Sequence, residues 1–344
     1  MRHTTLFAAA LAACTLLAAC SGGSQSFSSI PAAGSNPNAA PVAHADLART
    51  GIAPRFFNLI RSLRPVPKGL KPAKTPADLF IDDNGTNAVD IFTSKGWTLA
   101  GTLSGGSSGV NGPDGNFVDK RGVLYVTNIN NANITEYAPG ATMPMFTYSA
   151  GMKDPIDVAV DRNGRVYEAD WDTGQGAGFV NEYPAGVDSV LRSCSPGGSV
   201  QSVVVDGYGN VFVSLDFASG GAGIVEYARG LKGCHATNLA VPLQSAGGMT
   251  MDSQGNLIVC DQFAAAVDVI APPYSSVTRT IGANFVDPFH VTIDKKNDQV
   301  YVTDAGFGDV AVLHYPSGAF AGIIGTYQGL VSPLGAVASQ NYVP

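Results

Sequence analysis

Short apolar stretches recur throughout residues 78–344, and a polar turn separates the two stretches of each pair. Five such segments are GNFVDKRGVLYVTN, DVAVDRNGRVYEAD, SVVVDGYGNVFVSL, MTMDSQGNLIVCD and HVTIDKKNDQVYVTD. An Asp ends the first stretch of each segment, at positions 119, 161, 206, 252 and 294, so successive units start 42, 45, 46 and 42 residues apart. This regular spacing indicates an internal repeat of one structural unit.

Each unit has the composition of a β-hairpin. The anchoring Asp begins an Asp-x-x-Gly turn or a near variant, in which its carboxylate can accept backbone N–H groups and the Gly supplies a positive φ. A β-branched and aromatic stretch follows, as expected of a second strand. A third strand is indicated by ITEYAPG, VNEYPAG, IVEYARG and VAVLHYPSG, and a less regular fourth strand precedes the next unit. Each unit is therefore predicted to be one four-stranded antiparallel blade.

The sixth unit is divided between the two ends of the repeat region. The stretches ADLFIDD, NAVDIFT and LAGTLSG supply second, third and fourth strands without a first strand before them. At the C-terminal end, SPLGAVAS aligns with DPIDVAVD and places Ser339 where the anchoring Asp would be. Pairing these pieces would remove exposed sheet edges. The sequence thus predicts an all-β, six-bladed β-propeller over 78–344, closed by a C-terminal strand that joins the N-terminal blade.

The first nineteen residues have the pattern of an export signal, with Arg2 followed by an apolar run that ends at Ala19. The sequence Leu17-Ala18-Ala19-Cys20 resembles the lipobox of bacterial lipoproteins, which implies that Cys20 is lipidated and becomes the mature N-terminus. Ser21, rather than Asp, follows the cysteine, and by the same resemblance this implies an exported chain anchored in the outer membrane, facing the periplasm or the cell surface.

Residues 20–77 are expected to connect the anchor to the folded body. The part up to about Ala45 is rich in Ser, Gly, Pro, Ala and Asn and predicts a flexible linker. Residues 46–64 have apolar positions at roughly helical spacing with arginines between them, although Pro54 interrupts the pattern. This short amphipathic helix could lie on anionic lipid or pack on the propeller, and the sequence leaves both readings open.

Charge is divided unequally along the chain. Residues 1–75 contain eight Lys or Arg and one acidic residue, whereas residues 76–344 contain twelve basic and twenty-six acidic residues. A body this acidic repels phosphate backbones, so nucleic acid is not expected as a partner.

The recurring phrase, read as Pro-x-x-Val-x-Val-Asp-x-x-Gly-x-Val-Tyr-Val-x-Asp with a later Ile-x-x-Tyr, resembles the NHL repeat. The whole body is similar to the NHL and SMP-30/gluconolactonase-like group of propellers, in which the motif is specific for fold and weak for function. That resemblance implies a calcium-dependent lactonase or lyase as one alternative. Pro113-Asp114-Gly115 matches one metal-ligand phrase of that branch, but its Glu and Pro-Asn-Gly phrases are missing. Asp114 is thus a weak metal candidate, since calcium prefers six to eight oxygen ligands.

Four positions before each anchoring residue, the repeats form a column of Gly115, Asp157, Ser202, Gly248, His290 and Gly335. We expect this column near the channel mouth where the first strands begin, with the small residues leaving room beside the polar ones. Asp157, Ser202 and His290 are candidates for ligand binding there, together with Asp114 and Gln201 one position earlier. Polar side chains at a channel mouth also often hold only ordered water.

The cysteines other than Cys14 and Cys20 fall inside the repeats. Cys194 and Cys234 lie in the outer regions of consecutive blades, where an inter-blade disulfide could form in an oxidising compartment, while Cys260 falls in a second strand and reads as a small buried residue.

The sequence contains no complete catalytic constellation. We therefore expect a membrane-tethered, monomeric, non-catalytic propeller that binds a protein, peptide or glycan partner at the cell envelope and needs no cofactor. The alternative is a metal-dependent lactonase or lyase with a degenerate site at Asp114, Asp157 and His290, with calcium as its cofactor.

Overall fold

The computed structural model describes residues 79–339 except 94, 172–176, 218–220 and 283–284. The predicted export signal, Cys20, the linker over 20–77 and the amphipathic segment 46–64 lie outside the described residues. Within the described part of the chain, no helix has both the length and the apolar character needed to cross a bilayer.

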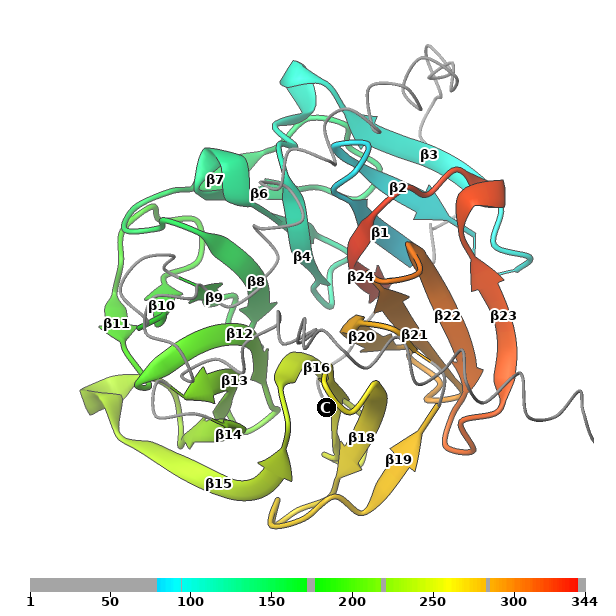
Figure 1. Ribbon diagram of the computed structural model, residues 1–344. Coiled ribbons are helices and arrows are strands. Elements are labelled where there is room, and N and C mark those ends of the chain that lie inside the picture. The colour runs from blue at the N-terminus through cyan, green and yellow to red at the C-terminus, as the bar shows by residue number, and fades with distance from the viewer. Residues whose placement is uncertain (1–78, 94, 172–176, 218–220, 283–284, 340–344) are drawn as a thin grey trace, which may run out of the picture. The chain divides into compact units, whose positions relative to one another are not determined.

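The described chain forms six four-stranded antiparallel sheets, which confirms the predicted six-bladed propeller (Figure 1). The first sheet contains β24 (Pro333–Ala338), β1 (Leu79–Asp83), β2 (Ala88–Phe92) and β3 (Leu99–Ser104). The second contains β4 (Pro113–Val118), β5 (Leu124–Asn128), β6 (Asn133–Tyr137) and β7 (Phe146–Tyr148). The third contains β8 (Pro155–Val160), β9 (Val166–Asp170), β10 (Phe179–Tyr183) and β11 (Arg192–Cys194).

The remaining three sheets repeat this plan. The fourth contains β12 (Gly198–Val205), β13 (Val211–Phe217), β14 (Ala222–Tyr227) and β15 (Ala236–Leu243). The fifth contains β16 (Ala246–Met251), β17 (Leu257–Asp261), β18 (Ala266–Ile270) and β19 (Arg279–Ile281). The sixth contains β20 (Pro288–Ile293), β21 (Gln299–Asp304), β22 (Asp309–His314) and β23 (Phe320–Ile324). Short 3₁₀ turns are η1 (Gly106–Ser108), η2 (Ile129–Asn131), η3 (Lys232–Cys234) and η4 (Thr326–Gln328).

The anchoring Asp residues shape the turn after five of the six inner strands, as predicted. The Asp119 carboxylate accepts the backbone N–H groups of Arg121 and Val123, at 2.8 and 3.0 Å. Asp161, Asp206 and Asp252 each make the equivalent pair of bonds. The Asp294 carboxylate instead accepts the backbone N–H groups of Asp298 and Gln299, four and five residues further on. Gly122 has φ 79°, which a residue with a side chain rarely adopts. These local bonds explain why the same phrase recurs in five units.

Closure of the ring follows the prediction from the C-terminal repeat fragment. Strand β24 pairs antiparallel with β1, with Ala336 opposite Ile81 and Ala338 opposite Leu79. The inner strands β4, β8, β12, β16, β20 and β24 each contact the next around the central axis, as Figure 1 shows. Because β24 completes the first sheet, no blade lacks its inner strand.

The hydrophobic core is divided among the junctions between blades. The described residues form six clusters of buried apolar side chains, and each cluster contains mainly residues from two neighbouring sheets. For example, Val204 and Phe212 of one blade pack with Met249 and Leu257 of the next. Each sheet therefore depends on both of its neighbours to bury its faces.

The connections define two faces of this ring. The inner strands begin at one face, here called the lower face, which also carries the turns between second and third strands. They end at the opposite, upper face, which carries the Asp-anchored turns and the turns between third and fourth strands. This assignment follows from the antiparallel order of every sheet.

Candidate functional site

The candidate site is built around an irregularity that recurs in every inner strand. In β8 the register passes from Pro155 opposite Asp170 to Asp157 opposite Ala169, so Ile156 has no partner of its own. The same one-residue β-bulge occurs in β4, β12, β16, β20 and β24. Bulges re-aim the neighbouring side chains. Nothing in the sequence predicts this bulge, which sets the direction of the candidate side chains.

The six-membered column predicted from the repeats is brought together just after these bulges. Its members are buried inside the ring: Asp157 is 3%, Ser202 0% and His290 9% exposed. The column therefore does not lie at an open channel mouth.

The glycines of this column do not leave open space, contrary to the expectation from the sequence. A Cβ atom on Gly248 would lie 2.6 Å from the Cα of His290, and one on Gly115 or Gly335 would overlap the backbone of the next inner strand. These positions are glycine because adjacent inner strands approach too closely for a side chain.

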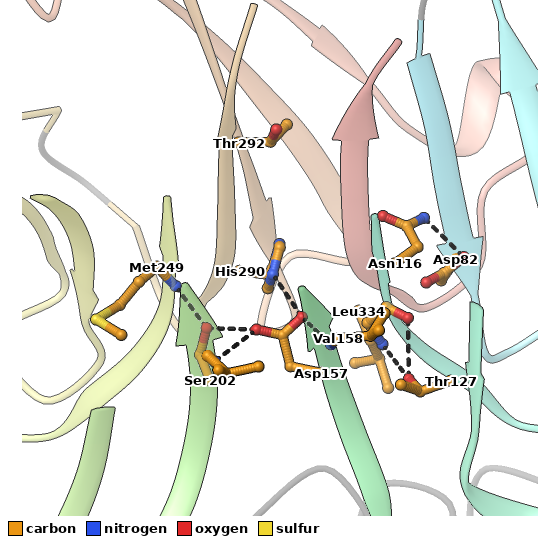
Figure 2. Close-up of polar contacts among 12 residues, drawn as sticks. Asp82, Asn116, Thr127, Asp157, Val158, Ser202, Met249, His290, Thr292 and Leu334 are labelled. Carbon is orange, nitrogen blue, oxygen red and sulfur yellow. Dashed lines mark hydrogen bonds and ion pairs between the residues drawn. The ribbon is translucent and has the colours of Figure 1, made fainter. Parts of the chain in front are cut away.

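Asp157 is the centre of the polar contacts in the ring (Figure 2). Its Oδ2 accepts the Ser202 hydroxyl and the backbone N–H of Val203 at 3.0 Å. Its Oδ1 accepts the N–H of Val158 at 2.8 Å and lies 3.6 Å from Nε2 of His290. A buried carboxylate is tolerated when it has such partners, and this one joins three inner strands.

Ser202 is not arranged as a nucleophile. Its hydroxyl donates to Asp157, not to His290, and it accepts the backbone N–H of Met249 at 3.1 Å. A serine nucleophile needs a base within hydrogen-bond reach of its own hydroxyl. Since Asp157 lies between the serine and the histidine, the three residues form a structural link between blades, not a hydrolytic triad.

Asp114 lies in the bulge of β4, near a second buried acid that the sequence analysis missed, Asp82 of β1. Burial raises the pKa of Asp114 well above its usual range, and the charges of Asp82 and Asp157 raise it further. Burial likewise raises the pKa of Asp82, although a hydrogen bond from Asn116 acts in the opposite direction.

These residues do not fit the calcium site that the family resemblance implies. The bulge positions equivalent to Asp114 are Ile156, Gln201, Phe289 and Leu334, besides Gly247. Gln201 donates from Nε2 to the Ser199 hydroxyl at 3.3 Å. Among the described residues, no group of three or more His, Cys, Asp or Glu side chains is arranged to hold a metal ion. Calcium needs more oxygen ligands than this position supplies.

A cavity of about 170 Å³ occupies the central channel between the column of Asp157 and His290 and the upper face. The floor of this cavity is lined by Asp157, His290 and Asn116. Its opening at the upper face is lined by Ser253 and Lys295. Its walls come from all six inner strands and are mostly Val, Ala, Met and Ile side chains. Asp114, Gln201 and Ser202 do not line this cavity.

Asn116 is the cavity residue that the sequence analysis missed, although the repeat contains a signal for it. Three positions before the anchoring residue, the other five units have Val158, Val203, Met249, Val291 and Ala336. A single amide in a column of apolar residues marks an exception to the packing pattern. Asp82 is a similar exception, because Thr127, Ala169, Ser214, Cys260 and Thr303 occupy its column.

The outer part of the ring contains a disulfide between the cysteines that the sequence placed in consecutive blades. Cys194 ends β11 and Cys234 ends η3, with their Cα atoms 5.4 Å apart. This bond ties the third blade to the fourth. Cys260 is a buried free thiol.

Comparison with known proteins shows the fold alone. No family model and no curated protein matches the chain. A chain in the crystal structure of a nidogen/laminin complex is similar, with a TM-score of 0.62 and 17% identity over 76% of this chain and 98% of that chain.

Two bacterial structures of unknown function are also similar. One, from Desulfotomaculum acetoxidans, has a TM-score of 0.56 and 10% identity over 76% of this chain and 98% of that chain. The other, from Bacteroides caccae, has a TM-score of 0.56 and 10% identity over 78% of this chain and 100% of that chain.

Proposed function

We propose that this chain is a lipid-anchored envelope protein whose propeller binds a protein partner and performs no chemistry. The observation that carries this proposal is a group of exposed apolar side chains on the lower face, here called the lower-face patch: Val286, Phe307 and Tyr327. These side chains are 55%, 61% and 103% exposed. Exposed apolar side chains that gather on one face of a folded protein mark interaction sites.

The loops that carry these side chains touch one another. A Cβ atom on Gly306 would overlap the side chain of Val286, and one on Gly308 would lie 3.1 Å from the carbonyl oxygen of Val331. The loop from 325 to 332, which contains Tyr327, thus lies against the turn that carries Phe307. The patch spans the sixth blade and the connection that closes the ring.

Asp304 holds two of these loops in place. Its carboxylate accepts the backbone N–H groups of Val286 and Asp287, at 2.8 and 3.0 Å, and of Gly306 and Phe307, at 3.0 and 3.1 Å. Pre-ordered loops lose less conformational entropy on binding. The exposed aromatic side chain of Phe307 is therefore presented by a rigid turn.

The charge around the patch favours a basic partner. Asp287 and Asp309, both half-buried, lie in the same loops as Val286 and Phe307. The turns of the upper face carry Lys120, Arg121, Arg162, Lys295 and Lys296. We infer that the partner is a protein segment that places Lys or Arg side chains around an apolar residue, because an acidic rim complements that arrangement. The similar chain from the nidogen/laminin complex also belongs to a protein–protein assembly.

Site-specific cross-linking in the native envelope tests this proposal. A photo-reactive residue at position 327 should capture one specific partner, whereas the same group at Tyr208, an 86% exposed side chain on the upper face, should not. The captured protein should bind the purified propeller, and a Phe307→Ser/Tyr327→Ser variant should lose at least about tenfold in affinity. Tyr208→Ser is the matched control and should bind normally.

Several outcomes would contradict the proposal. These are equal capture at both positions, capture of a glycan, or a partner whose affinity the double variant leaves unchanged. A partner without basic side chains at the contact would contradict the inferred charge complementarity.

The membrane anchor and the family assignment belong to the same proposal. The lipobox-like Leu17-Ala18-Ala19-Cys20 supports lipidation of Cys20 and delivery to the outer membrane, and the repeat phrase supports membership of the NHL-like propellers. Wild-type cells fed labelled palmitate should yield a labelled chain in the membrane fraction. A Cys20→Ala chain should be unlabelled and soluble, and a labelled or membrane-bound Cys20→Ala chain would refute the anchor.

A further inference from the structure

The floor of the channel cavity contains hydrogen-bonding atoms that have no partner among the described residues. Asn116 is 3% exposed, and its Nδ2 donates to Oδ1 of Asp82 at 2.9 Å. That bond fixes the orientation of the amide, whose Oδ1 accepts no hydrogen bond from the described residues. Figure 2 shows this oxygen on the side of His290 and Thr292, and the nitrogen on the side of Asp82. Asn116 therefore presents an unused acceptor to the cavity.

His290 supplies a second unused atom at the same depth. Its Nε2 faces Oδ1 of Asp157 at 3.6 Å, while Nδ1 has no partner among the described residues. In the neutral ring that places its hydrogen on Nε2, towards the carboxylate, Nδ1 is an acceptor. An unpaired buried polar atom is costly, so a ligand that donates to both acceptors would be favoured.

The electrostatic balance around the floor favours a positive charge. Asp82, Asp114 and Asp157 interact with one another through their charges, and the His290 ring lies 3.6 Å from Oδ1 of Asp157. The pKa values of Asp82 and Asp114 are raised first by burial and then by the neighbouring carboxylates. A raised pKa favours the neutral carboxyl, and a cation placed beside these groups would favour their ionised forms.

The rest of the cavity matches an apolar body. Val203, Met249, Val291 and Ala336 line its walls, and its volume of about 170 Å³ limits the ligand to a small molecule. A polar floor with apolar walls is the usual arrangement of small-molecule sites in proteins.

We propose that the channel cavity binds a primary ammonium group carried on a short apolar chain, with the ammonium donating to Oδ1 of Asn116 and Nδ1 of His290. An ammonium has three donors and no acceptor, which matches two unused acceptors close to buried carboxyl groups. The site lies on the axis below the upper face, so it is independent of the lower-face patch.

Calorimetric titration of the purified full-length chain with n-butylammonium chloride tests the proposal. Binding should be saturable and at least about tenfold tighter than that of n-butanol, because the alcohol lacks the charge and two of the donors. Sodium butyrate should not bind. Equal affinity for n-butanol, which would indicate a floor that holds a neutral hydroxyl or water, would overturn the proposal, as would the absence of ammonium binding at about 10 mM.

Two variants locate the binding. His290→Phe removes Nδ1 but keeps an aromatic ring, and it should abolish the heat of n-butylammonium binding. Thr250→Trp fills the cavity from a half-buried wall position without touching the floor, and it should also abolish binding. Tyr208→Ser on the exposed surface should bind like the wild type. Unchanged binding in a folded Thr250→Trp chain would show that the ligand lies elsewhere, even if His290→Phe fails to fold.

Discussion

Asp157 and Asp216 are both buried, but their carboxylates differ in the number of hydrogen-bond donors around them. Asp157 has three hydrogen-bond donors and an imidazole around its carboxylate. Asp216, at the end of β13, is 6% exposed and receives a hydroxyl from Ser245 at 3.5 Å. Burial, which outweighs the hydrogen bonds, raises the pKa of Asp216 to about 7. Individual acids therefore need to be judged by their partners, not by their burial alone.

This difference predicts how stability should change with pH. The folded pKa of Asp216 is above its unfolded value, so its stabilising contribution is complete below about pH 4 and is lost as the pH rises through about 7. Asp216→Asn keeps the shape without the charge. Relative to wild type, the variant should gain about 2–4 kcal/mol in free energy of unfolding between pH 4 and pH 8, measured by urea denaturation.

Asp188→Asn is the matched control because its effect should have the opposite sign. Although burial acts to raise the pKa of Asp188, hydrogen bonds from Ser149 and Ala150 lower it overall. Removing that carboxylate should therefore cost stability above pH 4 and none below its folded pKa. If Asp216→Asn and wild type have the same stability at every pH, burial does not raise the pKa of Asp216.

Each repeat combines two local features, an Asp-anchored turn and a β-bulge in the inner strand. The Asp-anchored turn could be predicted because all of its bonds lie within four or five residues of the Asp, as with Asp119 and Val123. The inner-strand bulge could not, because it is defined by the register against a second strand. Near Ile156 the sequence shows an uninterrupted β pattern, and only the pairing with β9 reveals the extra residue.

The disulfide between Cys194 and Cys234 joins two elements whose own contacts are few. Strand β11 has three residues and η3 has three, and the bond closes a separation of 40 residues along the chain. A cross-link over such a loop restricts the unfolded chain and typically contributes about 2–4 kcal/mol. It therefore reinforces the outer edge of the junction between the third and fourth blades.

For the whole molecule, the closing strand determines whether the six sheets form a ring. Strand β24 supplies Ala336 and Ala338 to the cluster between the sixth and first blades, where they pack with Leu79 and Ile81. A chain that ends at residue 332 should lose that cluster and leave β1 without its inner hydrogen-bonding partner. We expect it to unfold at lower urea concentration and with a broader transition.

A circular permutant provides the control for this truncation. Moving residues 333–339 in front of Leu79, joined by a short turn, would supply the same strand from the other end of the body. The permutant should recover the single sharp urea transition of the wild type, monitored by circular dichroism. If the truncated chain is as stable as the wild type, or the permutant as unstable as the truncated chain, closure by β24 does not hold the ring together.

The sequence by itself determined the number of blades, their turns and the split first sheet, because these depend on short-range periodicity and on which residues a turn accepts. It also placed Asp157, Ser202 and His290 in one column. Only the tertiary structure decided that the column lies buried, that Ser202 donates to Asp157, and that Asn116 and Asp82 join it. Those facts depend on which strands become neighbours across blades and on the bulge that turns each side chain, and neither is encoded within a single repeat.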